Sequence, residues 1–326
     1  KNRQETLGQA RAEASAQPPQ LVQDDARWQL FFKADRSFGA PKGQVKIFFW
    51  LPAETAAEDV VLSRLWILAL VDRLTEYFFE AGVAGLNFEV TKTIEGLSLE
   101  VSGFNDKLTL LLRELLAQLW DFQGPTQSEF ERALDVVLRE QRSFDKQPPY
   151  RYASYSADLA VAIPEYSIGF LRKQAAGVTR AQVCGFSAKF RSCDQRLFGQ
   201  ALVHGNFDSD DLAEIWKAMK GLPFVALPRT SFCRLRLAEL PPGRDTWLVR
   251  PGPNPDDMNH ALSVVFYLGS GSQAHVRSQL LQSMLQEPFL QRIRSERQLG
   301  YVVLSRADRV GGLVARLQLT VQSSVA

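Results

Sequence analysis

The stretch Gln291-Arg-Ile-Arg-Ser-Glu-Arg-Gln-Leu-Gly-Tyr301 joins two different sequence patterns and indicates how the chain is built. Before its end, apolar residues recur at helical spacing over residues 274–296. After it, the bulky residues 301–305 are typical of a strand, and a second strand pattern covers residues 313–321. Gly300 permits a tight turn between the two patterns. The stretch therefore predicts a long helix that turns directly into a β-hairpin.

The same order of patterns occurs earlier in the chain. A helix predicted over residues 56–80 is followed by the break Ala84-Gly85-Leu86 and by a hairpin over residues 86–102. Strand patterns precede both helices; they lie at residues 28–33 and 44–51 in the first copy, and at 235–240, 245–250 and 261–267 in the second. A repeat of this size indicates a domain duplication.

The patterns between the two copies complete the predicted fold. Helices are expected over residues 105–122, 126–145, 151–163, 166–176, 179–189 and 210–220, and a strand over residues 196–203. Hairpins mixed with blocks of helices predict an α+β fold, in which two homologous domains each have a mainly antiparallel sheet with helices on one face. We expect residues 1–24 to form the end of a preceding domain and a linker, 25–224 a first complete domain, and 232–326 a second, incomplete one.

Composition excludes several classes of function. The chain has 326 residues and a net charge of +2, without a basic stripe that would bind nucleic acid. It has no apolar run long enough to span a membrane. Its histidines are His204, His260 and His275, and neither HExxH nor the inverted HxxEH can be written. Its three cysteines are widely spaced, so no metal site is expected in this chain.

Three stretches carry a family resemblance. They are residues 87–107 (NFEVTKTIEGLSLEVSGFNDK), Val203-His204-Gly205-Asn206, and Gln286-Glu-Pro288 together with Arg294-Ser-Glu-Arg-Gln-Leu-Gly-Tyr301. Together they resemble the third and fourth domains of the insulinase/pitrilysin family of zinc peptidases. The resemblance implies an enzyme of four similar domains that closes around its peptide substrate. The first of these domains holds the HxxEH zinc motif. This chain would supply the third domain and part of the fourth.

The resemblance also assigns site residues. In the family, an arginine and a tyrosine seven residues apart contact the substrate backbone near the scissile bond, and these positions match Arg294 and Tyr301. Such groups stabilise the developing oxyanion. Two positions depart from the family pattern, because Arg297 stands where a glutamate is frequent and Leu290 where some members have an aromatic residue. Phe289, Leu290 and Arg297 are therefore secondary candidates for substrate contact.

From the residues alone, other interpretations stay open. Spacing alone favours a structural interpretation, in which Arg294 is a cation at the end of a helix and Tyr301 an aromatic residue in a strand, and only the family resemblance favours a functional one. The arginines around them form either a solvated helix end or a basic wall for peptide carboxylates; they are Arg292, Arg294, Arg297, Arg306 and Arg309. His204 is interpreted as structural, and Asn105 or Asp106 as the cap of the helix that follows.

The sequence thus predicts the non-catalytic, substrate-binding C-terminal half of a zinc-dependent endopeptidase that encloses peptides. Zinc would be bound by an N-terminal half, which is the expected partner beside the peptide, and this chain alone would be inactive. The alternative is an inactive family-like scaffold or recognition subunit. General peptide degradation and dedicated processing, such as in pyrroloquinoline quinone maturation, both fit. Cytoplasm and periplasm both fit as compartments, and cytoplasm is preferred.

Overall fold

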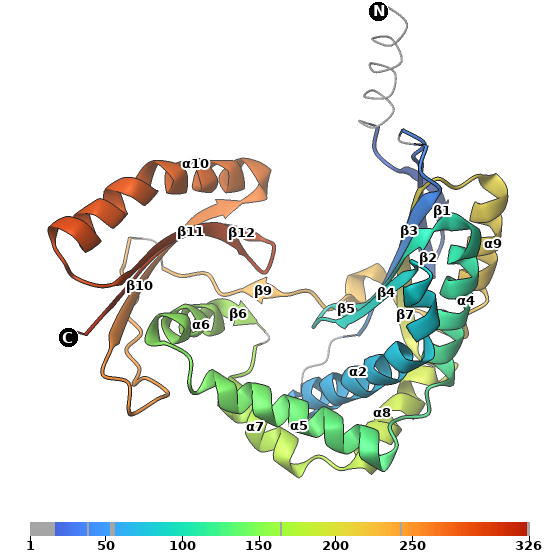
Figure 1. The fold of residues 1–326 in the computed structure, drawn as a ribbon, viewed down its shortest axis with the longest axis horizontal. Helices are drawn as coiled ribbons and strands as arrows, with labels where there is room; N and C mark the ends of the chain where they lie inside the picture. The colour runs from blue at the N-terminus through green and yellow to red at the C-terminus, as the bar shows by residue number, and fades with distance from the viewer. Residues whose placement is uncertain (1–16, 38, 53–55, 164, 242, 325–326) are drawn as a thin grey trace, which may run out of the picture. The chain divides into compact units, whose positions relative to one another are not determined.

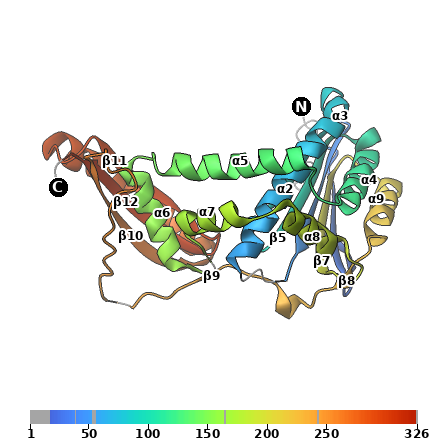
Figure 2. The same cartoon turned by 90° about the horizontal axis from the view of Figure 1, so that it is seen from below.

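The computed structural model describes residues 17–324 apart from residues 38, 53–55, 164 and 242. The Ala-, Glu- and Gln-rich composition of residues 3–17 predicts a polar helix, and nearly all of these residues lie outside the described part of the chain. The chain divides into two compact units (Figures 1 and 2). Unit 1 is Lys1–Val136 with Gln174–Arg234, and unit 2 is Val137–Lys173 with Leu235–Ala326. The domain boundaries given above stay a prediction, and the two units are described separately.

Unit 1 is built on a seven-stranded sheet in the order β1-β2-β7-β3-β5-β4, with β8 paired to β7. The pairs β2–β7 and β7–β8 are parallel, and the other neighbours are antiparallel. The strands are β1 (Gln20–Asp24), β2 (Trp28–Ala34), β3 (Lys42–Trp50), β4 (Asn87–Lys92), β5 (Gly96–Phe104), β7 (Arg196–Gly205) and β8 (Val225–Ala226).

Helices cover one face of this sheet. They include α2 (Ala57–Tyr77), α3 (Phe79–Val83), α4 (Asn105–Asp121), α8 (Arg180–Arg191) and α9 (Ser209–Lys220). The 3-10 turn η1 (Arg229–Ser231) lies on the other face, where Arg229 stacks over the Phe198 ring. Trp120 of α4 meets Phe49 of β3 edge to face, with ring centroids 5.5 Å apart. Trp216 of α9 meets Trp28 of β2 in the same way at 6.0 Å. The core of unit 1 therefore lies between the sheet and these helices.

The helix boundaries follow local signals where side chains cap the backbone. Thr179 and Asp208 each form a capping box with the residue three positions later. The prediction of a cap at Asn105 or Asp106 is wrong: α4 begins at Asn105 behind Phe104, without a side-chain cap. The amide of Asn105 instead donates to the carbonyl oxygen of Asn206 at 2.6 Å, which ties α4 to the end of β7.

Unit 2 contains a three-stranded antiparallel sheet in the order β10-β12-β11. Its strands are β10 (His260–Ser270), β11 (Val302–Val310) and β12 (Val314–Ser323). The helix α10 (Gly271–Leu290) packs mainly on β11 and β12. On the opposite face, α6 (Pro149–Val161) packs on β10 and β12 through polar contacts, such as Gln318 Nε2 to Ser154 Oγ at 2.8 Å.

Short elements complete the description of the chain. The two-residue strands β6 (Ala162–Ile163) and β9 (Arg236–Leu237) pair within unit 2. The helices α5 (Gln127–Phe144) and α7 (Ile168–Gly177) each have residues in both units. The prediction of a strand over residues 235–240 holds only for β9, and the strand predicted over residues 245–250 is not formed. The helix predicted over residues 274–296 begins earlier than expected, at Gly271, directly after β10 ends at Ser270.

The repeat predicted from the sequence is visible in the strand order. In unit 1, β3 is followed by α2 and by the hairpin β4–β5, which pair as β3-β5-β4. In unit 2, β10 is followed by α10 and by the hairpin β11–β12, which pair as β10-β12-β11. The two units therefore share an α+β core of the same topology.

Candidate functional site

The helix that carries Arg294 does not end as a regular α-helix. After Leu290 it widens into the π-helical turn η2 (Gln291–Glu296), and Arg294 lies in this turn. The turn closes when Leu299 donates its backbone N–H to the carbonyl of Ile293 at 3.0 Å. Gln298 has a φ of 53°, and it is the one non-glycine residue with positive φ in the described part of the chain. Both π-helical turns and left-handed side-chain-bearing residues are enriched at functional sites.

Arg294 and Tyr301 are brought together by this turn. The Cζ atom of Arg294 lies 4.7 Å from the centroid of the Tyr301 ring. A cation–π contact at an exposed site is worth about 0.5–1 kcal/mol. Tyr301 is 81% exposed, and Arg294 is exposed as well. The contact therefore orients both side chains while leaving a guanidinium and a phenolic hydroxyl available to a ligand.

Gly300 has a role that differs from the predicted one. The backbone reverses at Gln298, and Gly300 itself has no positive φ. A Cβ atom at Gly300 would instead collide with the carbonyl oxygen of Gln322 and press on Val321. Glycine is thus required because β12 passes directly beneath the turn. The close approach of Gly300 to β12 fixes the backbone position of Tyr301, the residue before β11.

The secondary candidates lie around the pair with different exposure. Phe289 and Leu290 are half-buried in the last turn of α10, and Arg297 is exposed. Two of the surrounding arginines are engaged in ion pairs: Arg292 with Glu296 at 2.6 Å and Arg306 with Asp308 at 2.8 Å. The roles of these side chains in substrate contact stay a prediction.

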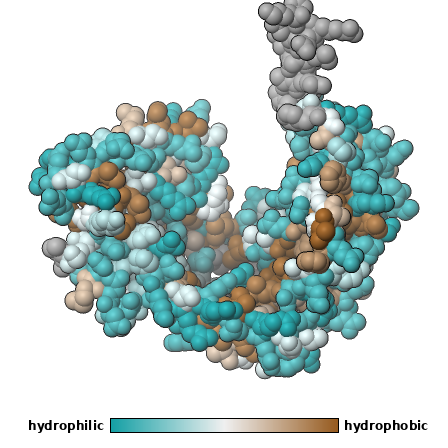
Figure 3. All heavy atoms as spheres, in the orientation of Figure 1, coloured by the Kyte–Doolittle hydropathy of each residue, from teal (hydrophilic) through white to brown (hydrophobic). Residues whose placement is uncertain are grey.

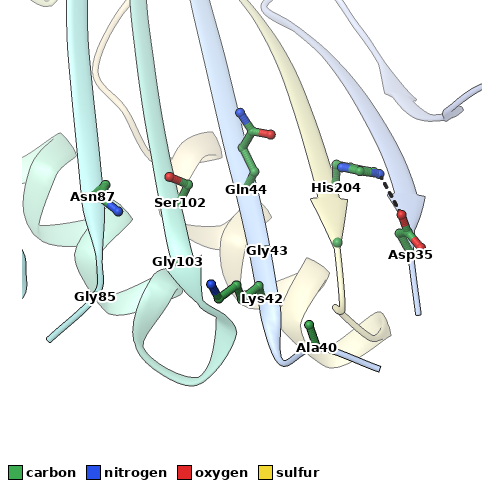
Figure 4. Close-up of a pocket in the computed structure, with 11 residues that line it drawn as sticks. Asp35, Ala40, Lys42, Gly43, Gln44, Gly85, Asn87, Ser102, Gly103 and His204 are labelled. Atoms are coloured by element: carbon green, nitrogen blue, oxygen red, sulfur yellow. Dashed lines mark ion pairs between the residues drawn. The ribbon is translucent and has the colours of Figure 1, made fainter. Parts of the chain in front are cut away.

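Unit 1 contains a separate polar depression at one end of its sheet, with a volume of about 400 Å³ (Figure 4). Strand register aligns Asn87 with Ser102, Ser102 with Gln44, and Gln44 with His204. Figure 4 shows these four residues on four adjacent strands, one beside the next. The row could not be found in the sequence, because β7 enters the sheet beside β3 from more than a hundred residues away.

His204 lies at the edge of this depression. Its Nε2 atom is 3.7 Å from a carboxylate oxygen of Asp35. Hydrogen bonds from Ser37 hold the pKa of Asp35 below its ordinary value, and His204 adds to this effect. His204 thus lies beside one carboxylate at a strand end, and its structural role stays a prediction.

The side chains of the described residues do not fit a zinc ion. In the described ranges, no group of three or more His, Cys, Asp or Glu side chains is placed to hold a metal. A zinc site needs three or four such ligands around one point. Among the same residues, no helix is both long enough and apolar enough to cross a membrane.

Comparison with known proteins assigns the family. Residues 4–169, half of the chain, match the model of the middle or third domain of peptidase M16. The chain belongs to the peptidase M16 family. Residues 280–326 also match the fourth domain of the C-terminal lobe of PqqF-like proteins of pyrroloquinoline quinone synthesis. The second match includes the turn that carries Arg294 and Tyr301.

Relatives of this M16 chain are longer than the chain itself. It is 27% identical over 314 residues to the insulin-degrading enzyme of Bos taurus, covering 94% of this chain and 30% of the relative. It is 26% identical over 311 residues to the A-factor-processing enzyme of Saccharomyces cerevisiae, with 94% and 30% coverage. The chain thus spans about a third of the length of these proteins.

Solved structures agree on the fold. A crystal structure of pitrilysin superposes with a TM-score of 0.74 at 22% identity, covering 94% of this chain and 32% of that one. A structure described as the inactive domain of an M16 peptidase from Pseudomonas fluorescens superposes with a TM-score of 0.63 at 13% identity, covering 94% and 74%. The insulinase/pitrilysin resemblance and the α+β fold predicted from the sequence are confirmed.

Proposed function

We propose that this chain is the substrate-binding, non-catalytic C-terminal part of a zinc-dependent endopeptidase that encloses peptides. The observation that carries the proposal is the exposed pair Arg294–Tyr301, in which the Cζ atom of Arg294 lies 4.7 Å from the centroid of the Tyr301 ring. A π-helical turn and the left-handed residue Gln298 bring the two side chains together. An N-terminal partner of the same protein would bind the zinc, since the described residues here offer no ligand set for it.

The two side chains suit a peptide backbone near the point of cleavage. The Tyr301 hydroxyl donates one hydrogen bond, and the Arg294 guanidinium offers several donors and a permanent positive charge. Both groups stabilise a carbonyl oxygen on which negative charge develops. The apolar neighbours Phe289 and Leu290 would contact the substrate side chain next to that bond.

The test is a reconstituted enzyme with paired substitutions. The chain is combined with its metal-binding N-terminal part, and cleavage of a quenched fluorescent peptide is followed. Tyr301→Phe and Arg294→Met are each expected to lower kcat by about 10²–10³-fold, as for the loss of one oxyanion donor. Tyr77→Phe and Arg277→Met remove the same groups from exposed positions elsewhere and should leave kcat unchanged.

Two outcomes would contradict this proposal. One is chelator-sensitive peptide cleavage by the chain alone. The other is unchanged kcat in both Tyr301→Phe and Arg294→Met, which would leave the pair a structural feature of the turn.

A second candidate function is an inactive scaffold or recognition subunit. It is favoured by the likeness to the Pseudomonas fluorescens structure, whose description is an inactive domain. The two candidates differ in the N-terminal part of the protein, which carries HxxEH only if the first proposal is right. Binding of a peptide without cleavage by the complete protein would favour the scaffold.

A further inference from the structure

The polar depression of unit 1 is not used by the proposed function. Its lining consists of polar side chains and glycines apart from Ala40 (Figure 4). Figure 3 shows that apolar patches interrupt the hydrophilic surface of the molecule, but none of the side chains that line the depression is a large apolar one. Binding sites fix the orientation of a ligand with a few placed polar groups. The depression therefore suits a polar ligand.

Glycines leave part of the depression without side chains. Gly43 pairs in register with Gly103 on one side and with Gly205 on the other. At each of the three, a backbone or ring atom lies where a Cβ atom would stand, so a larger residue could enter only with a displacement. The row of side chains that contains Gln44 lies directly next to these glycines. The depression is therefore a fixed feature of the strand ends.

One side of the depression offers hydrogen-bond donors and a positive charge. Lys42 is exposed, and its Nζ atom lies 5.5 Å from the centroid of the Phe104 ring. In the part of the chain that the structure describes, no carboxylate lies within ion-pair distance of Lys42. The side chains of Asn87 and Ser102 make no hydrogen bond with the same described residues. Figure 4 shows the Lys42 ammonium on the same side of β3 as these two side chains, so the three can bind one anionic group together.

The other side of the depression offers hydrogen-bond acceptors. The amide nitrogen of Gln44 donates to Glu100 of β5 at 2.5 Å. The carbonyl oxygen of Gln44 is therefore turned the other way, to the side of His204 (Figure 4). The Asp35 carboxylate follows at the end of β2, 3.7 Å from Nε2 of His204. The depression thus has donors with a positive charge on one side and acceptors with a negative charge on the other.

We propose that this depression binds the C-terminal carboxylate of a peptide, as a subsite separate from the pair in the π-helical turn. The carboxylate accepts hydrogen bonds from Lys42, Ser102 and Asn87. The backbone N–H of the same terminal residue donates to the carbonyl oxygen of Gln44. That the ligand is a peptide rests on the proposed function, whereas the contacts within the depression do not involve the pair.

The geometry favours a C-terminal residue over an acidic side chain. A C-terminal residue carries its carboxylate and its N–H on one Cα atom. This suits the donors of β5 and the acceptor of β3, because neighbouring strands lie about 4.8 Å apart. In an aspartate or glutamate, methylene groups separate the carboxylate from the Cα atom, so the two contacts fit less well. A charged acceptor also makes stronger hydrogen bonds with these donors than a neutral amide does.

The test compares peptides that differ at the C-terminus. A pentapeptide of glycine and alanine carries a dansyl group at its N-terminus and ends in either a free carboxylate or an amide. Its binding to the full 326-residue chain is measured by fluorescence anisotropy. The free acid should bind at least about tenfold more tightly, because amidation removes the charge that several donors contact. An amidated peptide with one central glutamate should bind as weakly as the plain amide.

Substitutions assign this preference to the depression. Lys42→Met should lower the preference for the free acid about fivefold, and Ser102→Ala about two- to fivefold. Lys220→Met removes an exposed lysine at the end of α9 and is the matched control, which should leave the preference unchanged. Equal binding of acid and amide would overturn the proposal. A preference that Lys42→Met and Ser102→Ala both leave intact would overturn it as well.

The results also separate this inference from the proposed function. A preference for the free acid together with unchanged kcat in Tyr301→Phe and Arg294→Met would support the subsite and contradict only the function of the pair. Lower kcat in those variants without a preference for the free acid would overturn the subsite alone. Binding of the glutamate amide as tight as that of the free acid would overturn the assignment to the C-terminus.

Discussion

Replacing Arg316 with methionine is expected to destabilise unit 2 strongly. Arg316 lies on β12 and is only 4% exposed. Its guanidinium donates to Asp308 of β11 at 2.6 and 3.2 Å and also to Asp158 of α6. Burial opposes its charge, but the two carboxylates outweigh this effect and raise the pKa of Arg316 above its ordinary value. One side chain therefore joins two strands and the helix on their polar face.

The expected loss of stability follows from these contacts. Removing one partner from a buried ion pair costs about 3–5 kcal/mol, because the other charge is left without compensation. Here Asp158 is nearly half exposed, and Asp308 keeps its ion pair with Arg306 at 2.8 Å. Water and Arg306 therefore offset part of the loss, and we expect about 2–4 kcal/mol for Arg316→Met. Arg306→Met removes an exposed arginine from the same carboxylate and should cost less than about 1 kcal/mol.

Amide hydrogen exchange along β10–β12 measures this difference for unit 2 by itself. At 1.36 kcal/mol for each factor of ten, Arg316→Met should accelerate exchange of the most protected amides about 30- to 900-fold. Arg306→Met should change the same rates by less than about fivefold. Arg316→Lys keeps the charge but loses the bidentate bond, so it should fall between the two. Equal, small effects of Arg316→Met and Arg306→Met would refute the reasoning.

Two further substitutions test unit 1 and the turn. Burial raises the pKa of Glu129, but hydrogen bonds from Arg73 and Thr126 outweigh it and lower the pKa from 4.5 to about 2. The contribution of the Glu129 carboxylate to stability is thus present above pH 4.5 and lost as the pH falls towards 2. In urea unfolding, Glu129→Gln should therefore lower the stability of unit 1 by about 2–3 kcal/mol at pH 7 and by little at pH 2. A loss that did not depend on pH would contradict this. Gly300→Ala places a Cβ atom against the carbonyl oxygen of Gln322. It should lower the free energy of opening of β11, as measured by amide hydrogen exchange, by about 1–3 kcal/mol. Gly185→Ala, in open space on α8, should instead stabilise by about 0.5–1 kcal/mol, and a similar effect at both glycines would be inconsistent with the close approach.

The elements that could be predicted from the sequence are those with local causes. The helix expected over residues 126–145 forms as α5, Gln127–Phe144, because its apolar residues recur at helical spacing. The hairpin expected over residues 86–102 forms as β4 and β5, because period-two alternation fixes which face is buried. The repeat itself was also predictable, since both of its copies contain these same local patterns in the same order.

The elements that could not be predicted depend on partners distant in the chain. Residues 245–250 have the composition of a strand, yet a strand needs a neighbour, and in the described part of the chain none is present beside them. Similarly, α10 was expected to bury its apolar face, but Val276, Leu280 and Met284 are exposed while Ser278 is buried. The apolar residues spread around this helix, so periodicity alone could not say which side faces the sheet.

The candidate site was predicted as a pair of residues but not as a geometry. The seven-residue spacing of Arg294 and Tyr301 would place them nearly two turns apart on a continuous α-helix. They meet because the helix widens at Gln291–Glu296 and the chain reverses at Gln298. Neither a π-helical turn nor a left-handed glutamine has a sequence signal, because both are imposed by the surrounding packing.

The two copies of the repeat differ at this one break in a way that favours a functional role for the second. In unit 1 the residue with positive φ before the hairpin is Gly85, for which the conformation has no steric cost. In unit 2 the left-handed residue is Gln298, and a side chain in that conformation costs about 1–2 kcal/mol. A turn selected for stability alone would use glycine again. The second copy tolerates the strained residue exactly where Arg294 and Tyr301 are held together and exposed, so the strain is consistent with selection for the presentation of this pair.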